Sequence, residues 1–152
     1  MPDEVVATGS SFVERYNTLI SGLELVNVRL AGVELSAPTI YVSESGRKLE
    51  AQISSSASYF NISTGIVAKA RLEFTGRYPD EEAAQLSVTI ELEVIYTASQ
   101  QMTDDVFDEF QKRNLPLNTW PFFRELLHTM LARAGWPLYT LPAFKFQSNA
   151  SL

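Results

Sequence analysis

The sequence has no cysteine and only one histidine, His128. Without cysteine there can be no disulfide framework, thiol nucleophile, iron–sulfur cluster or cysteine zinc site. No run of about 18 apolar residues is present to cross a bilayer. The acidic start, MPDEVV, also differs from the basic and then apolar start of a secretory signal. These absences predict a cytoplasmic protein that is not inserted into a membrane.

Net positive charge is also missing. The chain carries 12 lysine and arginine residues against 18 aspartate and glutamate residues, so its formal net charge is −6. Because the basic residues are scattered, we expect no cationic patch for phosphates and no nucleic-acid partner. The seven glycines are dispersed and form neither a dinucleotide-binding nor a Walker A pattern, so no nucleotide cofactor is expected.

Apolar residues, in contrast, make up 45% of the 152 residues. That share is sufficient for one globular domain with its own core. We therefore predict a single domain over residues 1–152, with a helical N-terminal extension at residues 1–22 and a short disordered tail at residues 147–152. No internal repeat or low-complexity segment divides the chain.

Alternating apolar and polar residues in the middle of the chain are typical of strands. In the first predicted strand, from Leu23 to Leu35, the alternation slips near Val26 and again near Gly32, which indicates two bulges. One face of the resulting antiparallel sheet is expected to be buried and the other exposed to water. The other three strands begin near Leu49, Ile66 and Leu86 and end near Tyr59, Tyr78 and Tyr96.

Helical spacing of apolar residues occurs at both ends of the chain. Residues 9–21 predict a short amphipathic helix after a serine-rich start that can cap its first turn. After the strands we expect one helix that ends near Arg113. A second helix is predicted from about Thr119 to Gly135, with Pro121 in its first turn. Strands followed by helices predict an α+β fold.

No arrangement of residues points to catalysis. His128 lies in a predicted amphipathic helix without a nucleophile beside it, so we interpret it as a structural or surface residue. Glu91 and Glu93 share one face of a strand and could form a carboxylate pair, but basic residues on the neighbouring strand favour ion pairing instead. The acidic residues at 104–109 lack EF-hand spacing and suit the first turn of a helix. We predict no enzyme, no metal site and no cofactor.

Aromatic and apolar residues outside the regular elements are the strongest candidates for function. A groove lined by them would accept extended apolar polypeptide, because aromatic faces contact many side chains without demanding one sequence. The alternative is that they cover the core or an oligomer interface. The candidate groove residues are Pro38, Ile40, Tyr41 and Val42 in a loop, and Trp136, Leu138, Tyr139, Leu141, Phe144 and Phe146 near the C-terminus.

The stretch from Asn114 to Phe146 resembles the SecB family of export chaperones. The matching motifs are the aromatic-Pro-aromatic start with Arg124-Glu125, the Arg133-x-Gly135-aromatic-Pro137 turn, the Leu141-Pro142-x-Phe144 ending and, more weakly, VELSAP at 33–38. The resemblance implies a four-stranded antiparallel Greek-key sheet with a long C-terminal helix and a short closing helix. It also implies a crossover loop from Ser36 to Arg47 and a homotetramer built as a dimer of dimers.

The function implied by this resemblance is that of a holdase, an ATP-independent chaperone that keeps unfolded polypeptides soluble for export or delivery. Some SecB-like proteins instead serve one client, the antitoxin of a toxin–antitoxin system. A non-chaperone scaffold on the same fold is a third alternative.

Export-type members of the family also contact the secretion ATPase. They do so through an acidic sheet surface, for which Glu34, Glu91 and Glu93 are the candidates here, and through a zinc-binding tail with cysteines. This chain ends at Ser151-Leu152 without cysteine. We therefore expect the tail contact with the ATPase to be missing, and the ATPase and an antitoxin both stay open as partners.

Overall fold

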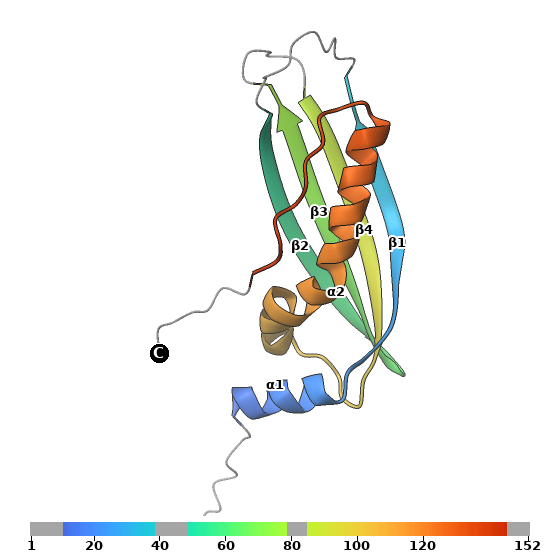
Figure 1. Cartoon of the computed structure of the whole chain (residues 1–152). Helices are drawn as coiled ribbons and strands as arrows, with labels where there is room; N and C mark the ends of the chain where they lie inside the picture. The colour runs from blue at the N-terminus through green and yellow to red at the C-terminus, as the bar shows by residue number, and fades with distance from the viewer. Residues whose placement is uncertain (1–10, 39–48, 79–84, 146–152) are drawn as a thin grey trace, which may run out of the picture.

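A computed structural model describes residues 11–38, 49–78 and 85–145. One short helix, α1 (Phe12–Ser21), precedes four strands and a long helix (Figure 1). The later elements are β1 (Glu24–Ser36), β2 (Glu50–Ile62), β3 (Gly65–Arg77), β4 (Gln85–Thr97) and α2 (Asp104–Arg133). The predicted α+β class is confirmed.

The four strands form one antiparallel sheet in the order β1-β4-β3-β2. Strands β2, β3 and β4 are successive neighbours, whereas the connection from β1 to β2 joins opposite edges of the sheet. This is the topology of a Greek key, as predicted. Residues 39–48 of the crossover loop and the predicted tail at 147–152 lie outside the described residues.

Strand β1 contains the two bulges that its slipped alternation predicts. Its register with β4 shifts between Leu25 and Asn27 and again between Leu30 and Gly32. Each bulge adds one residue to β1, so the apolar side chains after it return to the same face. Strand β2, in contrast, pairs with β3 along all 13 of its residues without a shift.

The core lies between one face of the sheet and α2, most of which runs over β4 toward β1 (Figure 1). Alternate residues of β3 and β4 point into the core, and the other residues form a polar face, as predicted. The largest fully buried side chains are Ile66, Leu72, Phe74, Leu86, Val88, Ile90 and Leu92 from the sheet, with Phe110, Leu115, Leu127, Leu131 and Leu141 from α2 and beyond.

Helix α1 begins with a capping box, as its serine-rich start suggested. The Ser11 hydroxyl accepts from the Glu14 N–H, and the Glu14 carboxylate accepts from the Ser11 N–H. The helix is held to the start of α2 by an ion pair of 2.8 Å between Arg15 and Asp105. Leu19 is its buried anchor in the core.

The prediction of two separate helices after the strands is wrong. Helix α2 is continuous from Asp104 to Arg133 and contains Pro116 and Pro121. A proline inside a helix lacks an N–H and crowds the preceding turn, so here it bends the helix without ending it. Figure 1 shows the change of direction between the first turns of α2 and the remainder. The first turns reach β2, while the remainder lies against β4 and β1.

The end of α2 is a Schellman motif at the glycine that the sequence predicted. Gly135 has a φ of +70°, which glycine adopts readily. The Trp136 N–H donates to the Leu131 carbonyl at 3.0 Å. The predicted short closing helix is absent from the described residues, because residues 136–145 form no helix. That prediction is therefore wrong for this part of the chain. Two prolines in this stretch disfavour one. We call residues 136–145 the C-terminal segment.

Candidate functional site: a hollow beside strand β2

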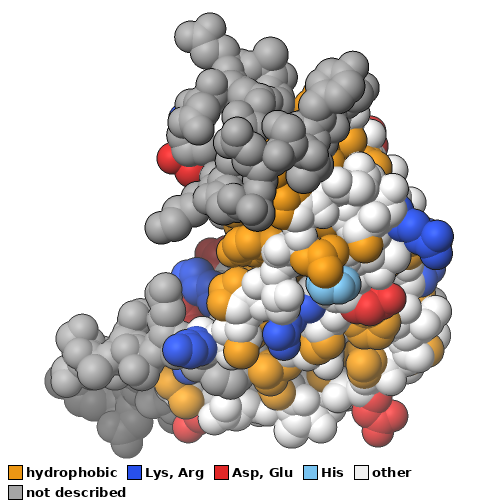
Figure 2. Space-filling view, turned by 45° about the horizontal axis from the view of Figure 1, so that its top comes forward, with side chains coloured by type: hydrophobic (Ala, Val, Ile, Leu, Met, Phe, Trp, Pro, Cys, Tyr) orange, Lys and Arg blue, Asp and Glu red, His pale blue; other side chains and the backbone are white. Residues whose placement is uncertain are grey.

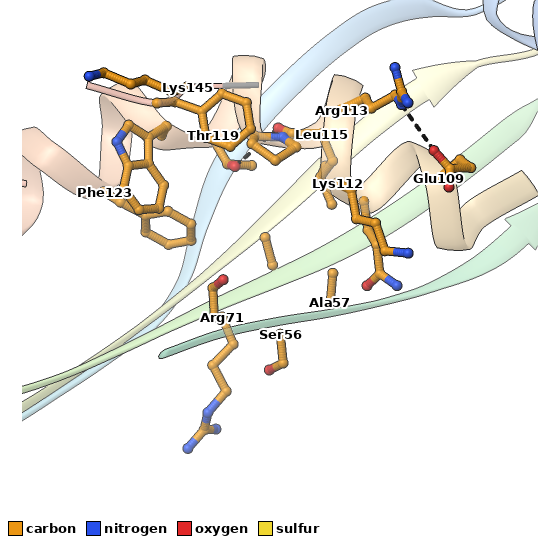
Figure 3. Close-up of a pocket in the computed structure, with 16 residues that line it drawn as sticks. Ser56, Ala57, Arg71, Glu109, Lys112, Arg113, Leu115, Thr119, Phe123 and Lys145 are labelled. Carbon is orange, nitrogen blue, oxygen red and sulfur yellow. Dashed lines mark hydrogen bonds and ion pairs between the residues drawn. The ribbon is translucent and has the colours of Figure 1, made fainter. Parts of the chain in front are cut away.

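A hollow of about 440 Å³ lies between β2, the first part of α2 and the C-terminal segment (Figure 3). We call it the β2 hollow. Its volume is in the range of pockets that bind small ligands, roughly 300–1,000 Å³. Its floor consists of small residues of the sheet, and its wall combines apolar and aromatic side chains with charged ones. The main lining residues are Ser55, Ser56, Ala57 and Ala70 of the sheet, Leu115, Pro116, Thr119, Trp120 and Phe123 of α2, and Phe144.

The hollow results from small side chains beneath a bent helix. Ser55 and Ala57 point toward α2 but fill little of the space below it. Two residues further along β2, the Tyr59 ring fills the equivalent space and lies 4.5 Å from the Phe107 ring. At the bend, the buried hydroxyl of Thr119 donates to the carbonyl of the preceding turn at 3.0 Å, a bond that often accompanies helix bending.

The C-terminal segment is tied to α2 at one wall of the hollow. The Trp120 indole N–H donates to the Pro142 carbonyl at 2.6 Å. The Trp120 and Phe144 rings lie 6.0 Å apart. At the start of the segment, just after α2, the Trp136 ring stacks on the Tyr78 ring, with 5.7 Å between the ring centroids. These contacts hold the segment across the face of the sheet, where Figure 1 shows it in front of β3 and β2.

The predicted groove residues of the C-terminal segment occupy three environments. Trp136 and Leu141 are buried in the core, and Tyr139 is half-buried against it. Leu138 is 60% exposed. Of the predicted residues that the structure describes in this segment, Phe144 alone lines the β2 hollow. The segment therefore divides between core packing and the candidate site.

Most of the predicted loop residues lie outside the described residues. Pro38 is half-buried, whereas Ile40, Tyr41 and Val42 of the loop, like Phe146, are not described. Their client-binding role stays a prediction. The site residues that sequence reasoning missed are on β2 and α2. The signal for the floor was the run SSSAS at 54–58, where small residues interrupt the apolar alternation.

Basic side chains outnumber acidic ones around the β2 hollow. Lys112, Arg113 and Lys145 line it, and Glu109 is the acidic residue among its lining residues, whereas the side chain of Arg71 points away from it (Figure 3). Arg113 pairs with Glu109 at 2.9 Å, and Arg71 pairs with glutamates on the far face of the sheet. Lys112 and Lys145 are exposed and make no ion pair with a described residue. The hollow is thus locally positive in an acidic chain.

The predicted acidic surface is a network of ion pairs on the face of the sheet away from α2. Glu93 pairs with Arg29 at 2.7 Å, and Glu91 pairs with Arg71 at 2.8 Å. The ion pairing predicted with a basic residue of β3 is confirmed for Glu91, whereas Glu93 pairs with a residue of β1. Glu34 lies on the same face and is exposed. Contact of this surface with a partner protein stays a prediction.

The acidic residues at the start of α2 serve the structure. Hydrogen bonds from the Thr103 hydroxyl and from Arg15 lower the pKa of Asp105, whose carboxylate also accepts the N–H of Val106. The Tyr59 hydroxyl donates to Asp104 at 2.7 Å, which raises the pKa of Tyr59 to about 12. These contacts join β2 and α1 to the first turn of α2.

Neither a metal cluster nor a membrane-spanning helix is found in the described part of the chain. No three of its histidine, aspartate or glutamate residues group as metal ligands. No helix there is both long and apolar enough to cross a bilayer. His128 is exposed on α2, and Figure 2 shows it at the surface among apolar, acidic and basic side chains.

Comparison with known proteins finds similarity in structure and none in sequence. No family model and no curated protein matches the chain. Rv1957 of Mycobacterium tuberculosis is a SecB-like chaperone, solved in complex with a ChAD peptide from the Rv1956 HigA1 antitoxin. It superposes with a TM-score of 0.73 over 86% of this chain and 97% of its own, at 11% identity.

A second structure is less similar. This protein of unknown function from Streptococcus agalactiae aligns over 80% of this chain and 97% of its own, at 11% identity and a TM-score of 0.43, which is too low to support an argument. At 11% identity the likeness to Rv1957 concerns the fold alone. The sheet order, the long C-terminal helix and this superposition together show that the chain has the fold of the SecB-like chaperones.

Proposed function

We propose that this protein is an ATP-independent chaperone that binds extended, non-native polypeptide in the cytoplasm and is not an enzyme. The observation that carries the proposal is an aromatic-walled hollow beside a sheet edge on a SecB-like fold. Apolar and aromatic side chains on its wall suit binding and release of polypeptide. Weak contacts repeated over several subunits would supply the affinity that a single hollow lacks.

The confined shape of the site favours a client-specific chaperone over a general holdase for export. A hollow of about 440 Å³ selects a few side chains by size, whereas a general holdase needs broad apolar surface. The glutamates predicted to face the secretion ATPase are engaged by arginines, which reduces the negative charge offered to that partner. The complex of Rv1957 with an antitoxin peptide is a precedent for such a client on this fold.

We also propose that the chain forms a homotetramer of two dimers. The support is an apolar row on β1 that a single copy leaves exposed. Its residues, Leu25, Val26, Leu30 and Leu35, are 41–59% exposed. Contiguous apolar surface of this kind usually marks an interface. Four copies of the 17.0 kDa chain would have a mass of about 68 kDa.

Native mass spectrometry tests both proposals. The protein is mixed, without nucleotide, with reduced and carboxymethylated α-lactalbumin, which cannot fold, and separately with the folded form. Because an unfolded chain exposes many different segments, we expect a species of about 68 kDa that captures it at the few segments that fit the hollow and ignores the folded form. A stable assembly that takes up no unfolded chain would overturn the chaperone proposal and favour a scaffold that binds a folded partner.

A matched pair of variants connects the capture to the β2 hollow. Phe144→Ala removes an aromatic wall residue, and Phe12→Ala removes a partly exposed phenylalanine of α1 that does not line the hollow. Loss of one buried aromatic contact is expected to weaken capture roughly tenfold in Phe144→Ala alone. Equal capture by the two variants would place the binding surface elsewhere.

A further inference from the structure

We propose that residues 3–6 of this chain occupy the β2 hollow when no client is bound, and so compete with the client from within the same molecule. This proposal rests on the proposed chaperone function and adds its regulation. The four residues are Asp3, Glu4, Val5 and Val6, which lie outside the described part of the chain. The described part supports the proposal through the charge of the hollow, its apolar wall and the position of α1.

Two lysines of the hollow have no carboxylate partner. Lys112 and Lys145 line it, are exposed and make no ion pair with a described residue. The third basic side chain at the hollow, Arg113, pairs with Glu109 at 2.9 Å. An occupant with two adjacent carboxylates would therefore complete the charge pairing, and residues 3–4 form such an acidic pair.

The apolar side chains of the hollow suit the two valines that follow the acidic pair. Leu115, Phe123 and Phe144 lie on its wall above a floor of serine and alanine residues. Because the valines come directly after the carboxylates in the chain, both kinds of group would reach their counterparts together. Each valine that leaves water adds to the affinity in proportion to its buried area.

Helix α1 begins close to the hollow and fixes the point from which the preceding residues extend. The Tyr16 hydroxyl donates to the Asn114 side chain, and the residues on either side of Asn114 line the hollow. Arg15 pairs with Asp105 at 2.8 Å. Figure 1 shows α1 beneath the first turns of α2. The start of α1 is thus held against the part of α2 that forms the hollow.

The chain before α1 is long enough to reach the hollow. Eight residues separate Asp3 from Ser11 and span up to about 26 Å when extended. Ser11 precedes Tyr16 by five residues, a rise of about 7.5 Å along a helix. The remaining length of about 18 Å exceeds the diameter of a helix with its side chains, about 10–12 Å. Residues 3–6 can therefore pass the first part of α2.

A second acidic stretch, PDEEAA at residues 79–84, is attached too far away. It directly follows Tyr78, and the register pairs Arg77 with Gln85 at that end of the sheet. Seven residues of β3 separate Arg77 from Ala70 at the floor of the hollow, a distance of about 23 Å. A six-residue connection that is anchored at both ends reaches about half of that distance. The acidic pair before α1 therefore fits the hollow better.

Attachment to the same chain makes a weak contact sufficient. A short connection between two binding groups typically gives an effective concentration of about 1 mM. With an intrinsic dissociation constant of roughly 0.2 mM, the segment would fill the hollow about five-sixths of the time and weaken client binding about sixfold. Clients with a strong anchor would displace the segment, whereas chains that bind weakly would be excluded.

Disulfide trapping tests the position of the segment in the client-free protein. The chain has no cysteine, so Val6→Cys combined with Ala57→Cys introduces a single pair of thiols. Ala57 points toward α2, whereas Ser56 points to the opposite face of the sheet (Figure 3). The matched control is therefore Val6→Cys with Ser56→Cys, whose second position is the more exposed of the two.

In a glutathione redox buffer, we expect the Ala57 pair to close within one chain at least about fivefold faster than the Ser56 pair, because a disulfide needs its β-carbons about 4 Å apart. Mass spectrometry of the unreduced protein measures both rates. Equal rates, or a faster Ser56 pair, would overturn the proposal. Disulfides that join two copies would also overturn it, since the occupant would then come from a neighbouring chain. No client is present, so these outcomes do not depend on the proposed function.

A charge reversal in the full chain tests the competition. Asp3→Lys with Glu4→Lys places cations beside the lysines of the hollow, so the segment should leave it and affinity for unfolded α-lactalbumin should rise about threefold to sixfold. Glu24→Lys with Glu125→Lys makes the same change of net charge at exposed residues that do not line the hollow.

The outcomes of this comparison separate the competition from the chaperone function. A rise in the first variant alone would support the competition. Equal affinities of wild type and the first variant, or an equal rise in the control variant, would overturn the competition and leave the chaperone function intact. If wild type and both variants capture no unfolded chain, the proposed function itself fails, and the trapping rates still decide where the segment lies.

Discussion

The adjacent residues Phe122 and Phe123 provide a direct test of how α2 packs. They are neighbours in the helix, yet Phe122 is 42% exposed and Phe123 is 2% exposed. Successive residues of a helix point about 100° apart, so one side chain faces outward and the other faces the core and the β2 hollow. Replacing each in turn by alanine removes the same atoms from the two environments.

The expected losses of stability differ about threefold. Phenylalanine-to-alanine changes in cores cost about 3–5 kcal/mol. For Phe123 we expect about 3 kcal/mol, at the lower end, because its neighbours can relax into the adjoining hollow. For Phe122, which is only partly buried, about 1 kcal/mol is expected. In a domain of this size these free energies lower Tm by about 6–12 °C and about 2–4 °C.

Urea unfolding followed by far-ultraviolet circular dichroism measures both losses. Unchanged m-values would show that the variants unfold from similarly compact states. Equal losses at low protein concentration would refute the assigned helix orientation. A loss for Phe122→Ala that grows with protein concentration would instead place this residue in an interface between copies.

Three other predictions concern parts of the fold that position the site. Asp105→Asn should destabilise the protein at neutral pH, because the hydroxyl of Thr103 and other donors hold the pKa of Asp105 below its ordinary value of 3.8. The stabilising effect of the ionised carboxyl is present above that value and is lost as pH falls through the lowered pKa, so denaturation curves of variant and wild type should converge in acid. Gly65→Ala would place a methyl group in steric overlap with the Tyr96 carbonyl oxygen. A loss of about 3 kcal/mol is expected, and an unchanged Tm would contradict the close approach. Trp120→Phe should keep an aromatic ring at this position but lose the indole hydrogen bond to the C-terminal segment. The expected cost in unfolding free energy is about 1 kcal/mol. Tryptic cleavage of that segment should then become faster, and an unchanged cleavage rate would show that the bond does not hold it.

Predictions from local patterns succeeded where one short stretch of sequence decides the structure. The slips at Val26 and Gly32 correctly indicated bulges, since a bulge changes the face on which the following residues lie. The end of α2 was predicted at Gly135 because only glycine readily takes the required backbone angle.

The same local reasoning failed at the prolines of α2. Pro116 and Pro121 each remove a hydrogen bond, which by itself favours a break in the helix. Side chains before and after them, such as Phe110 and Phe123, pack on the same core and stabilise one continuous, bent helix. Tertiary packing therefore outweighed the local preference. The apolar groups that decided the outcome lie on strands distant in the sequence.

By itself the sequence determined the fold class, the strand pattern, the resemblance to SecB and the presence of surplus aromatic residues near the C-terminus. It could not distinguish Trp136, which stacks on Tyr78 in the core, from Phe144, which lines the hollow. Both lie among similar neighbours in the chain, so only contacts with distant residues separate them. Only the tertiary structure decided the site, because the β2 hollow depends on small side chains at residues 55–57, a helix bend at residues 116–121 and a segment at residues 144–145 meeting in space.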